Sequence, residues 1–138
     1  MKKLLILMIA LIFTSCETTG KTAATDKNSL QGKWELTVLE GQNIAEKQPV
    51  YLEFKDDSKV SGFAGCNRLN GAYTLGKGNM ISFNQLATTR MACPQMELEI
   101  RVLKMLDKAD NFVIENDRLI LKTGRSKLLA VFEAVYFE

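Results

Sequence analysis

Three cysteines are the residues of this chain with the clearest capacity for chemistry: Cys16, Cys66 and Cys93. The sequence contains no histidine, so it lacks Ser-His-Asp and Cys-His catalytic arrangements and the commonest metal ligand. Cys66 and Cys93 are also too widely spaced for a Cys-x-x-Cys redox motif. The residue types therefore argue against nucleophilic catalysis, zinc binding and thiol redox chemistry.

Cys16 follows a segment with the features of a secretory signal. Met1 to Lys3 is basic, residues 4–13 are apolar, and the small residues of Thr14-Ser15-Cys16 come next. The apolar stretch is shorter than the roughly 20 residues that span a bilayer. Thr14-Ser15-Cys16 resembles the lipobox of bacterial lipoproteins, with Phe13 in place of the usual Leu. This resemblance implies that Cys16 becomes the lipidated first residue of the mature protein; the alternative is an ordinary signal peptide cut nearby.

If Cys16 carries lipid, Cys66 and Cys93 remain as one pair in an oxidising compartment, where disulfides form and persist. We predict a structural disulfide between them. Closing a loop of this length stabilises a fold by about 3–4 kcal/mol on the chain-entropy model. Two free buried thiols are the main alternative, and a metal-binding or redox pair is a weaker one.

Two other arrangements contain residue types found in chemical sites. Asp56 and Asp57 are adjacent in a predicted hairpin turn, where such pairs are normally solvated, and with Ser58 they supply too few oxygen ligands for calcium. Gly62 and Gly65 do not open a helix after a buried parallel strand, as phosphate-binding glycine loops do. We therefore predict no catalytic residue, no metal and no cofactor, and we expect that the protein is not an enzyme.

Charge and length limit the function classes further. The 138 residues include 18 basic and 16 acidic side chains, and removal of Lys2 and Lys3 with the signal leaves 16 of each. A nucleic-acid-binding domain normally has a basic face or a basic excess, so we expect no nucleic-acid partner. The predicted organisation is a signal peptide at 1–15, a polar flexible tether at 16–29 and one small domain at 30–138.

Short strands dominate the predicted domain. Residues 32–39 alternate with period two, which places Trp34, Leu36 and Val38 on one buried face. The apolar periodicity and intervening turn residues predict three hairpins, at 50–64, 72–83 and 111–122, and a last strand at 128–137. Residues 85–91 are expected to form a short strand or an extended approach to Cys93.

One amphipathic helix is predicted at about 94–109. Pro94 suits the first turn of a helix, and no Gly or Pro interrupts the segment that follows. Its apolar positions form two adjoining stripes: Met96, Ile100 and Leu103, and Val102, Leu106 and Ala109. The predicted fold class is α+β and β-rich: an antiparallel meander of about eight strands forms a barrel-like or strongly curved sheet, with the helix packed on it.

A stretch dense in Gly and Asn, residues 61–73, connects the first two hairpins. Glycine inside a strand pattern often marks a bulge, a bend or the close approach of another segment, which we expect at Gly62 and Gly65. Asn67 is predicted to be a turn former beside a solvated Arg68. The alternative is that Asn67 and Arg68 form a polar binding pair beside the bend.

Several blocks carry a family resemblance: Trp34 with Leu36, Val60–Asn67, Gly71–Tyr73, Thr89–Cys93, and the acidic helix start at Glu97 and Glu99. In this order and spacing, from Leu30 to Val135, they resemble the META domain family, which includes the bacterial heat-shock protein HslJ. The resemblance implies a small envelope or secreted protein, often a lipoprotein, with a β-rich α+β fold. It also implies links to stress responses, and the family has no established enzymatic activity.

The functional expectation is an envelope-anchored, non-enzymatic lipoprotein that acts as a stress-related or interaction module. Its candidate interaction surface consists of Asn67, Arg68 and Arg90. The expected partners are the membrane, through lipid on Cys16, and an envelope protein. The expected location is the bacterial cell envelope, at the outer membrane and facing the periplasm or the cell surface.

The alternative function is a carrier for a small apolar ligand held in the barrel interior. This hypothesis requires an internal cavity lined by Trp34, Phe54, Phe63 or Phe83. An exposed polar surface around Cys66 with a filled core would instead favour the interaction module.

Overall fold

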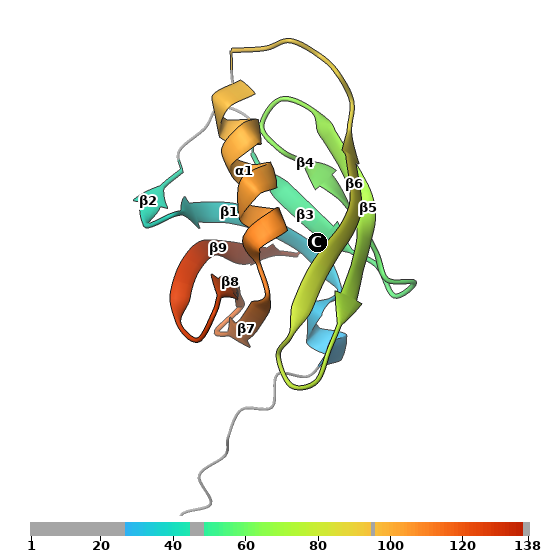
Figure 1. Ribbon diagram of the computed structural model, residues 1–138, viewed down its shortest axis with the longest axis vertical. Helices are drawn as coiled ribbons and strands as arrows, with labels where there is room; N and C mark the ends of the chain where they lie inside the picture. The colour runs from blue at the N-terminus through green and yellow to red at the C-terminus, as the bar shows by residue number, and fades with distance from the viewer. Residues whose placement is uncertain (1–26, 45–48, 95, 137–138) are drawn as a thin grey trace, which may run out of the picture.

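Antiparallel strands make up most of the chain that the computed structural model describes, which is residues 27–44, 49–94 and 96–136 (Figure 1). The elements in chain order are η1 (Lys27–Leu30), β1 (Gly32–Leu39), β2 (Gln42–Asn43), β3 (Tyr51–Phe54), β4 (Lys59–Phe63), β5 (Arg68–Leu75), β6 (Ile81–Thr88), α1 (Met96–Lys108), β7 (Asn111–Glu115), β8 (Arg118–Thr123) and β9 (Lys127–Val135). The predicted signal peptide, Cys16 and the tether as far as residue 26 lie outside the described residues.

The strands form one curled sheet. Its order is β6-β5-β4-β3-β1-β9-β8-β7, with β2 paired to β1. The two ends of this path approach at one corner, where Met80 and Asn111 form an isolated bridge and the Phe112 N–H donates to the Asn79 carbonyl at 2.9 Å. The predicted β-rich α+β class with a strongly curved antiparallel sheet is confirmed, and the curled sheet does not close into a full barrel.

The three predicted hairpins correspond to β3–β4, β5–β6 and β7–β8. The segment expected to be a short strand or extended approach belongs to β6, which continues to Thr88. The sequence did not predict β2, a two-residue strand in the polar segment after β1, or η1, which includes residues 27–29 of the predicted tether. Leu30 at the end of η1 is fully buried.

β1 changes its buried face part-way along its length. Trp34 and Leu36 are buried as the alternation predicts, but Val38 is only half-buried and Leu39 is fully buried instead. The pairing with β9 contains a bulge between Leu36 and Val38, so that Thr37 is the extra residue. One inserted residue moves every later side chain to the opposite face, and the prediction for Val38 was therefore wrong.

α1 lies against the sheet in front of β1, between the β5–β6 and β7–β9 arms (Figure 1). The helix is confirmed, but its buried stripe is not the one centred on Met96 and Ile100, which are 37% and 47% exposed. The buried helix positions are Leu98, Glu99, Val102, Met105 and Leu106. Of the two predicted apolar stripes, the buried one is Val102, Leu106 and Ala109, and Leu98, which neither stripe included, extends it toward the helix start.

The glycine-rich stretch between the first two hairpins is mostly strand. β5 begins at Arg68 and pairs with β4 as far as Ala72, so only 64–67 connect the two strands. A side chain at Gly62 would collide with the backbone carbonyl of Tyr51, and Gly65 has φ +108° with Leu98 of α1 packed against it. The predicted close approach and bend are therefore confirmed at these two glycines.

Candidate functional site

The connection between β4 and β5 is tied to the segment that precedes α1 by a disulfide between Cys66 and Cys93, whose Cα atoms are 6.0 Å apart. The predicted pairing is confirmed. The bond joins two segments 27 residues apart in sequence, so it holds the bend against the approach to the helix. Cys66 is 7% exposed.

Asn67 forms the centre of this junction. Its Oδ1 accepts hydrogen bonds from the Met91 N–H at 2.7 Å and the Thr89 hydroxyl at 2.8 Å. Its Nδ2 donates to the Met91 carbonyl and to Glu99 Oε1, both at 3.2 Å, and its backbone N–H donates to Glu99 Oε2 at 2.7 Å. Through one side chain, the bend is bonded both to the β6–α1 connection and to α1.

Glu99 is a buried carboxylate, with only 4% of its surface exposed. An acidic group at this depth needs hydrogen-bond donors to offset the loss of water, and both of its oxygens receive them from Asn67. The first turn of α1 also favours a negative charge. Glu99 is thus a structural acid that fixes the helix start to the bend.

The three residues predicted as an interaction surface have different environments. Asn67 is 2% exposed and its polar groups are used inside the protein, so it does not contribute to a surface. Arg68 and Arg90 are exposed. The Arg68 N–H donates to the Thr89 hydroxyl at 3.2 Å, which holds its backbone next to the junction. Asn67 is therefore a positioning residue for the exposed Arg68, and the prediction of a shared polar surface is corrected for Asn67.

Tyr51, Phe63 and Arg68 lie in one row on the face of the sheet opposite the buried Leu52, Phe54 and Val60. Phe63 on β4 is the register partner of both Tyr51 on β3 and Arg68 on β5. Residues directly opposite in neighbouring antiparallel strands share a face, with their Cβ atoms about 5 Å apart. Together with Pro49 these three residues line an open cleft of about 300 Å³.

A second row lies two residues further along each strand. Ser61 is the register partner of Glu53 and of Asn70, so this row shares the face of the first because the side-chain period is two. Its residues line a polar cleft of about 280 Å³ that also contacts Tyr51 and Arg68. We call the surface formed by Tyr51, Glu53, Ser61, Phe63, Arg68 and Asn70 the outer face.

Two polar groups of the outer face are available to bind a partner. No hydrogen bond or ion pair involves the Arg68 guanidinium group within the described part of the chain, and the same holds for the Tyr51 hydroxyl group. Lys33 of β1 places its Nζ 4.0 Å from the centre of the Tyr51 ring. This cation–π contact covers part of the ring and holds it in place, while Tyr51 still lines both clefts.

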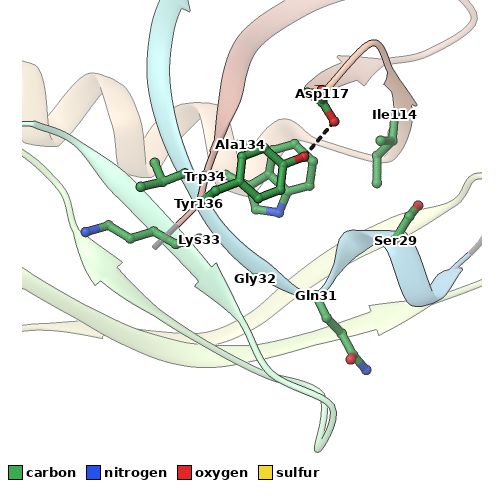
Figure 2. Close-up of a pocket in the computed structure, with 10 residues that line it drawn as sticks. Ser29, Gln31, Gly32, Lys33, Trp34, Ile114, Asp117, Ala134 and Tyr136 are labelled. Atoms are coloured by element: carbon green, nitrogen blue, oxygen red, sulfur yellow. Dashed lines mark hydrogen bonds between the residues drawn. The ribbon is translucent and has the colours of Figure 1, made fainter. Parts of the chain in front are cut away.

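Another cleft, of about 270 Å³, lies where η1, the start of β1 and the end of β9 meet (Figure 2). The Tyr136 hydroxyl donates to Asp117 Oδ1 at 2.6 Å, and this hydrogen bond is the main reason that the pKa of Tyr136 is raised. The Trp34 indole N–H donates to the Leu30 carbonyl at 2.8 Å. The polar groups of these side chains are therefore satisfied by the protein itself.

In the acidic turn between β3 and β4, Asp57 forms an ion pair with Lys59. Lys59 Nζ lies 2.7 Å from Asp57 Oδ2, and the side-chain hydrogen bond between them lowers the pKa of Asp57 and raises that of Lys59. Across 27–44, 49–94 and 96–136, no group of three or more Cys, Asp or Glu side chains could hold a metal ion.

Sequence reasoning missed most of the outer face and the role of Glu99. The signal for the outer face is present in the alternation, because Tyr51 and Glu53 stand out of phase with the buried Leu52 and Phe54. The register between strands, which aligns Phe63 with Tyr51, has no comparable local signal. Nothing in the helical pattern separates Glu99 from the exposed Glu97.

The sequence from residue 27 to residue 136 matches the META domain. The chain belongs to the META domain family. Among curated proteins, none matches this META domain protein. No helix in the described ranges is long and apolar enough to cross a membrane.

Three solved structures have similar folds. An NMR structure of a protein from Burkholderia xenovorans is 26% identical, with a TM-score of 0.64 over 80% of this chain and 86% of its own. Another NMR structure is also 26% identical, with a TM-score of 0.60, and the match covers 75% of this chain and 89% of the other. A DUF4847 family protein from Bacteroides vulgatus is 14% identical, with a TM-score of 0.58 over 78% and 95%, and shows the shared fold alone.

Proposed function

We propose that this META domain protein is a lipid-anchored interaction module of the bacterial cell envelope, without enzymatic activity, and that it binds its partner through the outer face. The observation that carries the proposal is the uncommitted guanidinium group of Arg68 beside the half-exposed rings of Tyr51 and Phe63. Rigid aromatic side chains next to an arginine are the residue types that dominate recognition surfaces.

The envelope location is supported by two features of the chain. The Thr14-Ser15-Cys16 sequence after an apolar segment has the form of a lipoprotein processing site. The disulfide between Cys66 and Cys93 is typical of proteins exported from the reducing cytosol. A stress-related role is proposed from membership of the META domain family. The residues that contact the partner are proposed from the structure of the outer face instead.

A binding role without catalysis is supported by the chemistry of the outer face. Ser61 has no histidine to act as its base, since the sequence has none. Glu99, the buried acid beside the face, accepts hydrogen bonds from the backbone N–H and the side-chain amide of Asn67. Its oxygens are thereby directed into the protein, away from any molecule on the outer face.

The carrier hypothesis has less support, because the aromatic residues it requires do not share one space. Phe54 packs edge-on against Tyr73, with ring centres 5.1 Å apart, and against Phe83 at 6.0 Å. These rings fill the interior on one side of the sheet. Phe63 lies on the outer face and therefore points to the other side of the sheet.

Site-specific photo-crosslinking in intact cells tests the interaction module. A benzophenone amino acid at position 63 replaces one aromatic ring by another, and the same group at Tyr136 is the matched control. We expect a crosslinked product from position 63 that disappears when Arg68→Gln is added, and no such product from Tyr136. Equal products from both positions, or none from position 63, would contradict the proposed surface.

Detergent phase separation tests the anchor separately. The mature protein is expected in the detergent phase, and a Cys16→Ser variant is expected in the aqueous phase or unprocessed. Wild-type protein that partitions into the aqueous phase would exclude lipid anchoring, while leaving the binding surface open to the crosslinking test.

A further inference from the structure

We propose that the outer face binds a glycan segment of about two sugar units that carries a carboxylate group. This inference rests on the proposed function and names the ligand class of the same surface. The two clefts meet at Tyr51 and Arg68, which line both of them. One is walled by aromatic rings and the other by polar side chains, so a ligand that spans both needs an apolar face and many hydroxyl groups.

The aromatic cleft fits the apolar side of a sugar ring. Pyranose rings present a flat face of C–H groups, and the negative face of an aromatic ring attracts such weakly positive hydrogens. Tyr51 and Phe63 are register partners on adjacent strands, so their positions are set by the sheet rather than by a flexible loop. A preformed aromatic platform of this kind lowers the ordering cost of binding.

The polar cleft offers both donors and acceptors in a small area. Glu53 supplies an acceptor, Lys55 a donor, and Ser61 and Asn70 supply both. Sugar hydroxyl groups act as donor and acceptor at once, so a mixed set of this kind matches them. A purely apolar ligand would leave these groups without partners, at a cost for each buried group.

Charge complementarity selects a carboxylated sugar. The planar guanidinium group of Arg68 is exposed and uncommitted within the described residues, and this group pairs with carboxylates through two parallel hydrogen bonds. Lys33 and Lys55 lie on the same side, next to Tyr51 and Glu53. Glu35, the register partner of Tyr51, ends the aromatic row on the side away from Arg68, so a carboxylate is favoured only at the Arg68 end. Glu53 lines the polar cleft, and its negative charge would repel a highly charged polyanion such as a nucleic acid. A ligand with a single carboxylate next to neutral hydroxyl groups therefore fits better.

The junction beneath Arg68 makes the site rigid. The preceding residue, Asn67, is buried and bonded to Met91, Thr89 and Glu99, and the Cys66–Cys93 disulfide closes the same bend. The backbone at Arg68 is therefore held in a fixed position at the end of the aromatic row. Its guanidinium group is offered to the ligand with little backbone freedom to lose.

Titration of the full-length mature protein with three disaccharides, followed by amide chemical shifts in NMR spectra, tests the proposal. The probes are N-acetylglucosaminyl-N-acetylmuramic acid, a disaccharide of hexuronic acid, and N,N′-diacetylchitobiose as the neutral control. We expect shifts confined to β3, β4 and β5 (Figure 1) and binding of at least one carboxylated probe about fivefold tighter than the neutral one. The stronger of the two acidic probes identifies the source of the carboxylate.

Variants separate the two halves of the site. Arg68→Gln is expected to abolish the preference for the carboxylated probe, while Arg118→Gln, an equal charge change on an exposed position of β8, leaves it unchanged. Phe63→Ala is expected to weaken the acidic and neutral probes alike. Retained amide spectra show that each variant remains folded.

The glycan assignment is overturned if none of the probes shifts the outer-face amides at millimolar concentration, or if the shifts map to the cleft of Figure 2. A neutral probe that binds as tightly as the acidic ones overturns the role of Arg68. If glycans fail while crosslinking from position 63 yields a product that depends on Arg68, the interaction module stands and its partner belongs to another class. If both experiments fail, the proposed surface itself is wrong.

Discussion

Replacement of Asn67 by alanine is the most informative perturbation of the junction. The side chain makes four hydrogen bonds to nitrogen or oxygen: two with Met91, one with Thr89 and one with Glu99. A neutral hydrogen bond contributes about 1 kcal/mol and one to a charged group about 1.5–3 kcal/mol. Thr89 and Met91 are exposed enough to bind water instead, whereas Glu99 is not. We therefore expect a loss of about 3 kcal/mol from a total stability of roughly 5–15 kcal/mol.

Urea unfolding of the oxidised protein measures this loss. The matched control is Asn70→Ala, an identical change on the exposed face of β5, which should alter the free energy of unfolding by less than about 0.5 kcal/mol. The expected result for Asn67→Ala is a lower midpoint with an unchanged slope. A loss below about 1 kcal/mol with the disulfide intact would refute the conclusion that Asn67 holds the bend.

A double-mutant cycle isolates the contact between Asn67 and Glu99. The cycle combines Asn67→Ala with Glu99→Met, which removes both oxygen acceptors, and contacting residues of this kind typically show a coupling energy of about 0.5 kcal/mol or more. Additive effects would mean that the buried carboxylate is stabilised by groups other than the Asn67 side chain.

Three further outcomes follow from the structure. Replacing Cys66 and Cys93 together by serine should lower the free energy of unfolding by about 3–4 kcal/mol, and equal unfolding midpoints for oxidised and reduced wild-type protein would contradict this. Gly62→Ala should destabilise the protein by more than about 2 kcal/mol or shift β4 away from the Tyr51 carbonyl, and a normal thermal unfolding curve would show that this contact is not tight. Burial raises the pKa of Tyr73 above its ordinary value of 10.0, so above pH 10 the unfolded chain binds fewer protons than the native one and stability falls as pH rises. Tyr73→Phe should flatten that fall between pH 9 and pH 11, and an unchanged slope in urea midpoints would exclude Tyr73 as its cause.

The sequence by itself determined the family and every helix and strand except η1 and the two-residue β2. Alternation between turn residues located the three hairpins, and the uninterrupted apolar period after Pro94 located α1. The number and placement of the cysteines also pointed to the observed disulfide. These features are local or compositional, so they are visible in one sequence without knowledge of what packs against what.

Tertiary structure decided which side of each element is used. The bulge near Thr37 transferred burial from Val38 to Leu39, and packing of Leu98 against Gly65 chose one of two apolar stripes on α1. Local periodicity predicts neither the buried face of β1 after the bulge nor the buried stripe of α1, because both depend on the register and position of a distant partner.

The same limit explains the functional residues. In the sequence, Glu99 looks like one of several acids at a helix start. It becomes a buried structural acid only because Asn67, 32 residues away in sequence, packs against it and donates hydrogen bonds to it. Tyr51 and Phe63 read as ordinary strand residues until the pairing of β3 with β4 places them side by side. The sequence supplies the residue types, and their long-range pairing creates both the rigid bend and the outer face.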